Sequence, residues 1–182
     1  MTRFYTKTGD DGYTSLLGKG RAPKYDHRIE TVGAIDEADA AIALARTFSL
    51  APQTSSILLE VQRDLYHMMS EVSAEPDIAS QFRKITDEQV SWLETQIDDI
   101  SSKVVIPAEF IIPGDSKAGA AIDLARTIVR RAERHLARLI HIKKLENHAL
   151  LHYMNRLSSL CFVLELLENQ NSGSNYPHLA KE

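Results

Sequence analysis

Three arginines at a spacing of four residues are the first feature that could do chemistry. On an α-helix Arg126, Arg130 and Arg134 would lie in a column on one face. Like charges at this spacing repel by a few tenths of a kcal/mol per pair, so an anion should offset them. Arginine offers planar, bidentate donors for phosphate or carboxylate. The column predicts an anion site; the alternative is a solvated basic face with Glu133 as counter-ion.

A second candidate for anion binding is the N-terminal segment Tyr5-Thr6-Lys7-Thr8-Gly9-Asp10-Asp11-Gly12-Tyr13-Thr14-Ser15. Its Gly-Asp and Asp-Gly steps predict turns, whose successive N–H groups can cradle an anion. Lys7, Thr8, Thr14 and Ser15 could add donors, and Lys24 follows after a glycine-rich stretch. The segment is not a Walker A loop, because the Gly-Lys-Ser/Thr ending before a helix is absent. An ordinary turn without a ligand is the alternative.

Composition indicates one globular domain over residues 1–182, with an irregular N-terminal loop over 1–26 and a flexible tail over 170–182. The net charge of −4 argues against a general nucleic-acid binder, so the arginine column is a local feature. The single cysteine, Cys161, excludes an intramolecular disulfide and a thiolate metal cage. No apolar run is long enough for a membrane span, and the N-terminus lacks a signal peptide. We expect a cytoplasmic protein without a membrane partner.

The elements that must position these residues are helical. Apolar residues recur at helical spacing over Ile29–Ala45, Ile57–Val72 and Val90–Ile100. A fourth helix, from about Ser116 to about Leu145, carries the arginine column, and a fifth carries Leu150–Leu164. Between the third and fourth helices the stretch 106–115, with two prolines, is not helical. The pattern predicts an all-α fold: a five-helix antiparallel bundle with an irregular N-terminal phosphate-binding segment.

Some polar residues fall where a plain bundle would place apolar ones. Asp36 follows Ile35 in the first helix, and if it faces inward it needs a cation, which the arginine column could supply. Asn155 interrupts the fifth helix in the same way. Each could equally be a surface residue near the core boundary. His148 and His152 lie four apart, but no third metal ligand is evident and no nucleophile triad suggests itself.

Five sequence blocks, taken in order, resemble one known family. They are Tyr5-Thr6-Lys7-Thr8-Gly9-Asp10, Gly33-Ala34-Ile35-Asp36-Glu37, Phe110-Ile111-Ile112-Pro113-Gly114, Ala125-Arg126-Thr127 with Arg130-Arg131-Ala132-Glu133-Arg134, and Asn155-Arg156-Leu157-Ser158. The family is that of the PduO-type ATP:cob(I)alamin adenosyltransferases, and the resemblance runs from about residue 3 to 169. One block alone would be modest evidence, whereas five in order are specific.

The resemblance implies a homotrimer with active sites between subunits. It implies transfer of the 5′-deoxyadenosyl group from ATP to the cobalt of a reduced corrinoid, cob(I)alamin, with release of triphosphate. ATP would be bound in one subunit by Thr6, Lys7, Thr8, Gly9, Thr14, Ser15 and Lys24. The neighbouring subunit would contribute Arg130, Arg131, Glu133, Arg134 and Asn155. Asp36 would pair with Arg126, Phe110 would lie against the lower face of the corrin ring, and Mg²⁺ would bridge phosphate oxygens. Further partners would be a reductase and an adenosylcobalamin-dependent enzyme.

Four residues depart from the family pattern. Ser159 replaces an aspartate, Leu166 an arginine, Asp123 a histidine and Asp115 the second glycine of a pair. They spare the expected nucleotide contacts and fall on the corrinoid side. The alternative function is therefore a non-catalytic relative that binds ATP or a corrinoid as a sensor or carrier.

Overall fold

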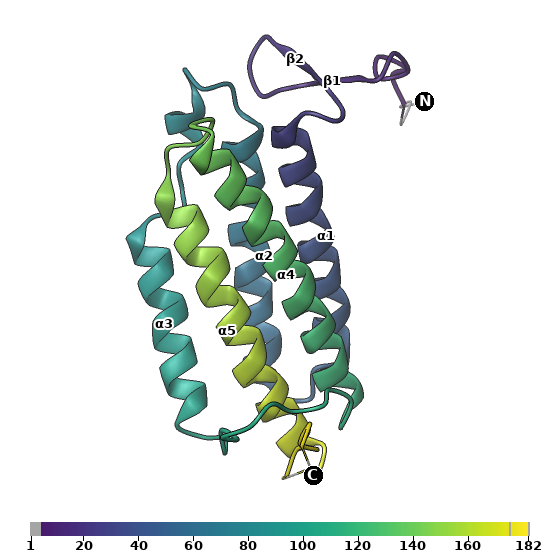
Figure 1. Cartoon of the computed structure of the whole chain (residues 1–182), viewed down its shortest axis with the longest axis vertical. Helices are drawn as coiled ribbons and strands as arrows, with labels where there is room; N and C mark the ends of the chain where they lie inside the picture. Colours follow the sequence, from purple (N-terminus) through teal and green to yellow (C-terminus); the bar gives the residue numbers. More distant parts are fainter. Residues whose placement is uncertain (1–4, 175, 182) are drawn as a thin grey trace.

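The structure is a computed structural model that describes residues 5–174 and 176–181. The described chain forms an antiparallel bundle of long helices (Figure 1), so the predicted fold class is confirmed. The helices are α1 (His27–Phe48), α2 (Pro52–Ser73), α3 (Asp87–Ser101), α4 (Lys117–His141) and α5 (His148–Asn171). A short 3₁₀ helix, η1 (Ala79–Phe82), precedes α3. Residues 1–4 of the expected nucleotide loop, and 175 and 182 of the expected tail, lie outside the described residues.

Most of the long helices start at a side-chain cap. Asp26, Thr86, Ser116 and Asn147 each accept a hydrogen bond from a backbone N–H of the first turn. At α3 Gln89 completes a capping box with Thr86. These caps satisfy N–H groups that have no partner within the helix.

The start of α2 lacks a cap of its own, and α5 supplies one. The carboxylate of Glu168 accepts from the N–H of Leu50 at 2.7 Å and of Ala51 at 3.2 Å. A carboxylate at this position also interacts favourably with the positive end of the helix dipole. Glu168 is fully buried and thereby fixes the α1–α2 turn on the last turns of α5.

The core lies along the whole length of the bundle. α4 packs between α1 and α5, and α5 also contacts α3 and α2. The apolar residues predicted to face inward are buried, with Ile35, Ile42, Leu65, Val129 and Leu157 completely shielded from solvent. None of the helices in the described part of the chain is long and apolar enough to span a membrane.

The fourth helix ends four residues earlier than expected. α4 stops at His141 because Lys143 adopts a left-handed conformation with φ 57. The N–H groups of Lys143 and Lys144 then bond back to the carbonyls of Ile140 and Leu139, both at 2.9 Å. Such reversed bonds satisfy carbonyls at a helix end. The arginine column, which ends at Arg134, is unaffected.

A buried arginine holds together the end of the bundle that carries the N-terminal segment. Arg28 donates from Nη1 to the carbonyls of Val72 (2.6 Å) and Ala74 (3.0 Å), and from Nη2 to that of Lys144 (2.6 Å). It thereby joins the start of α1 to the end of α2 and to the α4–α5 connection. Hydrogen bonds to a charged donor are among the stronger ones in proteins.

The N-terminal segment is more regular than expected. It contains a two-stranded antiparallel sheet of β1 (Tyr13–Ser15) and β2 (Arg21–Pro23), which lies beyond the start of α1 (Figure 1). The connecting turn is fixed to the end of α2, because Glu75 accepts from the N–H of Lys19 at 2.9 Å. Gly18 has φ 134, and a Cβ there would lie 2.0 Å from Glu75, so only glycine fits.

Candidate functional site

The residues expected to bind phosphate from the N-terminal segment gather in one exposed hairpin. The hydroxyl oxygens of Thr6 and Thr8 are 2.8 Å apart, and Lys7 between them has a left-handed backbone with φ 62. The ammonium of Lys24 lies over Gly9, where a Cβ would come within 3.2 Å of Nζ. The structure therefore brings together the hydroxyls of Thr6 and Thr8 and the ammonium of Lys24. The ammonium lies close to the backbone of Gly9, which has no side chain in the way. The predicted residues on this hairpin are Thr6, Lys7, Thr8, Gly9, Thr14, Ser15 and Lys24.

Arg21 organises this hairpin, and sequence reasoning missed it. Its guanidinium makes two bonds to the carboxylate of Asp11, at 3.0 and 2.9 Å, and also donates to the carbonyl of Thr8. The hydrogen bond from Arg21 lowers the pKa of Asp11, so this carboxylate stays ionised. No periodicity connects two residues ten positions apart in a glycine-rich segment, so only the folded hairpin reveals the pair.

The three arginines of the column lie in different environments on α4. Arg130 and Arg134 are exposed, and Arg134 donates to the carbonyl of Arg130 at 3.0 Å. Arg126 is half-buried and forms an ion pair with Asp123, one turn earlier, at 2.7 Å. Two guanidiniums therefore face solvent and are free to bind an anion, whereas the third already has a carboxylate partner.

The other predicted residues near the column are linked to neighbouring helices. Arg131 forms an ion pair with Glu37 of α1. Glu133 accepts from Nδ2 of Asn155 on α5 at 2.9 Å, so these two predicted residues do meet. Asn155 in turn accepts from Arg156 at 2.9 Å. These three interactions hold the polar side chains of Arg131, Glu133 and Asn155 in place on the helix that carries Arg130 and Arg134 and on its neighbour α5.

The two sets of phosphate-binding candidates do not meet within one chain. The hairpin extends beyond the end of the bundle near the start of α1 (Figure 1), whereas the three arginines belong to α4. In the part of the chain that the structure describes, no hydrogen bond or ion pair joins residues 5–24 to Arg130 or Arg134.

The expected pair between Asp36 and Arg126 is not formed within the chain. Asp36 is exposed, because the buried face of α1 passes through Ala34, Ile35 and Ala38. Arg126 bonds instead to Asp123, which needs no neighbouring helix because it lies one turn away on α4. The hypothesis of an inward-facing Asp36 is thus wrong for the isolated protomer.

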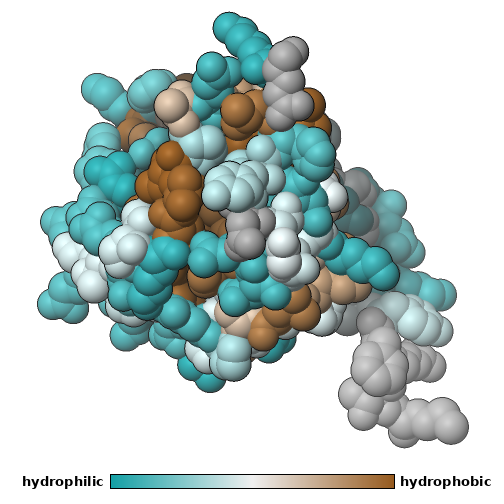
Figure 2. Space-filling view, turned by 90° about the horizontal axis from the view of Figure 1, so that it is seen from below, coloured by the Kyte–Doolittle hydropathy of each residue, from teal (hydrophilic) through white to brown (hydrophobic). Residues whose placement is uncertain are grey.

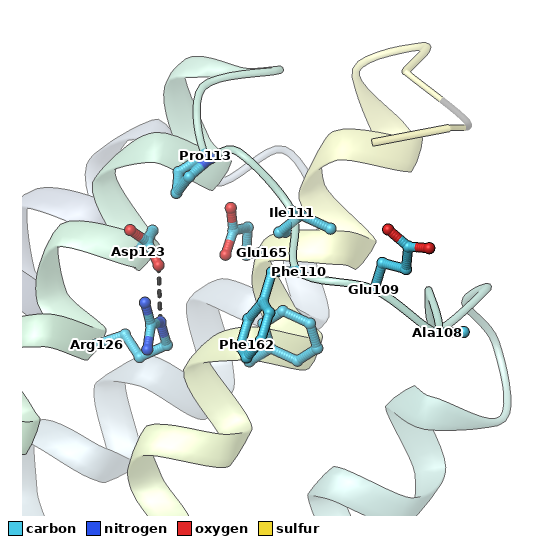
Figure 3. A pocket seen from close by; sticks show the side chains of 9 residues that line it. All are labelled: Ala108, Glu109, Phe110, Ile111, Pro113, Asp123, Arg126, Phe162 and Glu165. Atoms are coloured by element: carbon cyan, nitrogen blue, oxygen red, sulfur yellow. Dashed lines mark hydrogen bonds and ion pairs between the residues drawn. The ribbon is translucent and has the colours of Figure 1, made fainter. Parts of the chain in front are cut away.

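A pocket of about 380 Å³ lies between the non-helical insert and helices α4 and α5 (Figure 3). Phe110, Ile111 and Pro113 of the insert form one wall, and Phe162 of α5 contributes a second aromatic ring. Asp123 and Arg126 line the side formed by α4. The pocket therefore joins an apolar wall to a charged one, as ligand sites commonly do.

The same end of the bundle exposes further apolar side chains. Phe110 is 87% exposed, and Val105, Ile106 and Ile112 of the insert are also exposed. Figure 2, which views the molecule from this end, shows apolar residues between polar ones. A large apolar surface beside a pocket is typical of a surface that a ligand or another chain covers.

Glu165 is a site residue that sequence reasoning did not identify. It lies in the apolar run of α5, is completely buried and lines the pocket. Among residues 5–174 and 176–181, neither of its carboxyl oxygens has a hydrogen-bond partner. Burial raises the pKa of Glu165 to about 7, the carboxylates of Asp123 and Asp115 act in the same direction, and Arg126 opposes them. The only signal in the sequence is a glutamate between Leu164 and Leu166.

The described part of the C-terminal tail lies against the insert. The N–H of Ile112 donates to the carbonyl of His178, and that of Ala180 to the carbonyl of Phe110, both at 2.8 Å. Asp115 accepts from the N–H of His178 at 3.3 Å and also contacts its ring nitrogen Nδ1. The expected flexible tail therefore has, over 176–181, a specific contact with the segment that carries Phe110.

Comparisons with known proteins agree on one family. A sequence model of the family described as cobalamin adenosyltransferase matches residues 4–168. The chain is 37% identical over 175 residues to a corrinoid adenosyltransferase of Bacillus subtilis, covering 94% of this chain and 89% of that protein. It is 35% identical to the corrinoid adenosyltransferase PduO of Citrobacter freundii, over 94% of this chain and 51% of PduO. The chain thus spans about half the length of PduO.

Solved structures show the same fold. A variant of the PduO-type ATP:corrinoid adenosyltransferase from Lactobacillus reuteri, complexed with cobalamin and ATP, superposes with a TM-score of 0.89 at 28% identity, covering 99% of this chain and 97% of that one. Another variant of that enzyme, complexed with ATP, has a TM-score of 0.86 at 28% identity, with 98% and 100% covered.

Proposed function

The chain belongs to the cobalamin adenosyltransferase family, and from this premise we propose that it transfers the 5′-deoxyadenosyl group of ATP to the cobalt of cob(I)alamin, releasing triphosphate. The observation that carries the proposal is the pocket formed by Phe110, Phe162 and Arg126, because Arg126 lies on the same helix, α4, as the exposed Arg130 and Arg134. One helix would thus connect a partly apolar pocket for the corrinoid to donors for a polyphosphate.

The proposed chemistry requires no nucleophile from the protein. Cobalt(I) attacks C5′ of ATP, the C5′–O bond breaks, and triphosphate leaves with the electron pair. The one cysteine, Cys161, is buried, and burial raises its pKa to about 12, so it supplies no thiolate. The task of the chain is to orient ATP and to stabilise the charge that develops on the leaving group, for which one well-placed donor contributes about 3–4 kcal/mol.

The nucleotide site would be shared between two protomers of a homotrimer. The hairpin of one protomer would contact the phosphates through backbone N–H groups and hydroxyls. The column of the next would add charge and polar contacts through Arg130, Arg131, Glu133, Arg134 and Asn155. In the described part of one chain no hydrogen bond or ion pair joins these two sets, which supports an arrangement in which a neighbouring copy completes the site.

On the corrinoid side, the exposed ring of Phe110 would cover the lower face of the corrin. A dry aromatic contact would exclude the lower axial ligand and leave cobalt four-coordinate, which makes reduction to cobalt(I) easier. The exposed Asp36 would meet Arg126 of a neighbouring protomer. Such a pair would have to compete with the present partner, Asp123, for the guanidinium.

Magnesium would enter the site as the companion ion of ATP. In the described residues no three His, Cys, Asp or Glu side chains come close enough to form a metal cage. A Mg²⁺ ion held mainly by phosphate oxygens and water fits this arrangement. The reaction needs ATP and a strong reductant, so we place the enzyme in the cytoplasm, beside a reductase and an adenosylcobalamin-dependent enzyme.

The direct test is turnover of ATP with chemically reduced cobalamin, followed through the cobalt–carbon product and free triphosphate. We expect Arg130→Ala to lower ATP affinity or turnover by about tenfold or more, because a charge-assisted contact is lost. Arg138→Ala is the matched control, since Arg138 is exposed in the last turn of the same helix. Binding of ATP without product would favour the sensor or carrier, and unchanged kinetics in Arg130→Ala would overturn the site assignment.

A further inference from the structure

One carboxyl group in the Phe110 pocket has no use in the mechanism above. Glu165 projects from α5 into the space between α4 and the insert (Figure 3) and is completely buried. Both of its oxygens lack a hydrogen-bond partner in the described part of the chain. Buried polar groups are nearly always paired, so an unpaired carboxyl in a pocket indicates a missing ligand group.

The charged groups around Glu165 are already occupied by other partners. From α4, Asp123 accepts from Nε of Arg126 at 2.7 Å. From the segment before α4, Asp115 contacts His178 of the tail. Cys161, one turn earlier on α5, is buried and un-ionised at neutral pH. Glu109 lies at the mouth of the pocket and is exposed. None of these residues satisfies Glu165.

The chemistry of the wall restricts what the missing group could be. The carboxyls of Asp123 and Asp115 both act on Glu165 and only the guanidinium of Arg126 opposes them, so a carboxylate on the ligand would be repelled. A primary carboxamide suits this wall, because its two N–H groups donate to a carboxylate while its carbonyl accepts from a guanidinium. Asp123 uses Nε of Arg126, and no described residue accepts from the two Nη atoms.

We propose that Glu165 is a specificity-determining residue that hydrogen-bonds a primary carboxamide on the rim of the corrinoid and rejects corrinoids with a carboxylate there. The inference rests on the proposed function, because it takes the corrinoid as the occupant of the Phe110 pocket. The hydrogen bond from Glu165 would add a polar contact inside the pocket to the aromatic contact that Phe110 would make with the corrin ring. A site built around a buried polar group discriminates strongly, since a wrong ligand leaves that group unpaired.

The test compares cobalamin with its monocarboxylic acids, in each of which one rim propionamide is hydrolysed. Binding is followed by the visible spectrum, with saturating ATP at about pH 8, where Glu165 is largely ionised. We expect wild type to bind cobalamin at least about tenfold more tightly than one of the acids. Glu165→Gln and Glu165→Ala should reduce that ratio to about threefold or less, with ATP affinity unchanged within about twofold.

Glu88→Gln is the matched control, because it removes an exposed carboxylate from the first turn of α3, outside the pocket, and should keep the wild-type ratio. If wild type binds all the corrinoids equally well, the role of Glu165 is overturned while the proposed function stands. The same holds if both Glu165 variants keep the wild-type ratio of affinities for cobalamin and the acid. Loss of discrimination in Glu88→Gln would also overturn it. Failure of wild type to bind any corrinoid would instead overturn the proposed function together with it.

Discussion

Replacing Glu165 by glutamine should stabilise the folded protein at high pH and change its stability little at low pH. The carboxyl is completely buried without a partner, so ionising it in the folded state is unfavourable. Glutamine has nearly the same shape and no charge. The variant therefore isolates the effect of the ionised form while leaving Asp123, Arg126 and Asp115 in place.

The size of the effect follows from the pKa of Glu165. Its pKa of about 7 in the folded protein lies above the ordinary value of 4.5, which we take for the unfolded chain. Between these two values the folded state holds the proton more tightly, so stability is lost as pH rises through this window and is constant above it. At 1.36 kcal/mol per pH unit, wild type should lose up to about 3 kcal/mol that Glu165→Gln retains.

The assay is urea unfolding of both proteins from pH 5 to pH 8, followed by circular dichroism at one protein concentration, because oligomers unfold in a concentration-dependent way. The two stabilities should be similar near pH 5 and diverge steadily toward pH 7. The corresponding difference in Tm is about 2–4 °C per kcal/mol for a chain of this size. Glu109→Gln, which removes an exposed carboxylate, should show no such divergence.

Parallel stability curves for wild type and Glu165→Gln between pH 5 and pH 8 would refute the reasoning. That result would mean that Glu165 titrates as an ordinary glutamate, and hence that water or another group already satisfies it. Divergence in the opposite direction, with wild type gaining stability as pH rises, would mean that the ionised form has a cationic partner. In both cases the carboxyl would no longer be available to a ligand.

Three further changes test other parts of the molecule. Tyr153→Phe removes the hydroxyl that donates to Oδ2 of the buried Asp64 at 2.8 Å. Urea titrations should show a free energy of unfolding that is lower by about 1–3 kcal/mol. An unchanged value would mean that Asp64 finds another donor. Glu75→Ala releases the N–H of Lys19 and the hairpin turn, so the KM for ATP should rise while circular dichroism stays the same; an unchanged KM would separate the hairpin from nucleotide binding. Phe110→Ala should lower the rate with cob(II)alamin plus reductase more than ATP affinity, and equal losses in both would contradict its place on the corrinoid side.

The fold could be predicted because the sequence signals of the helices are strong and local. Apolar residues at helical spacing marked each buried face, and Ser116 marked a helix start that the structure confirms as a cap. The end of α4 was less predictable. Lys143 has no intrinsic preference for a left-handed backbone, and its conformation follows from the turn into α5.

The site was predictable only where one element determines it. The arginine column follows from spacing alone, and the structure places Arg130 and Arg134 in solvent as a column should. Asp36 shows the limit of this reasoning, since an acid next to a buried Ile35 can turn outward on a helix. Glu165 was missed for a related reason: α5 is packed by α3, α4 and α2, so periodicity does not distinguish its pocket face from its core face.

The position of α4 bears on how one protomer could take part both in binding the corrinoid and in stabilising the departing triphosphate. Arg126 and Arg134 are eight residues apart, which corresponds to about 12 Å along a helix axis. A helix that is buried along one side keeps this separation fixed, so the pocket beside Arg126 and the exposed guanidinium of Arg134 cannot drift relative to each other. C5′ of ATP would have to lie between them. The insert and the N-terminal hairpin are loops, so they supply the contacts that adjust to the ligands while α4 holds the distance between the reacting groups.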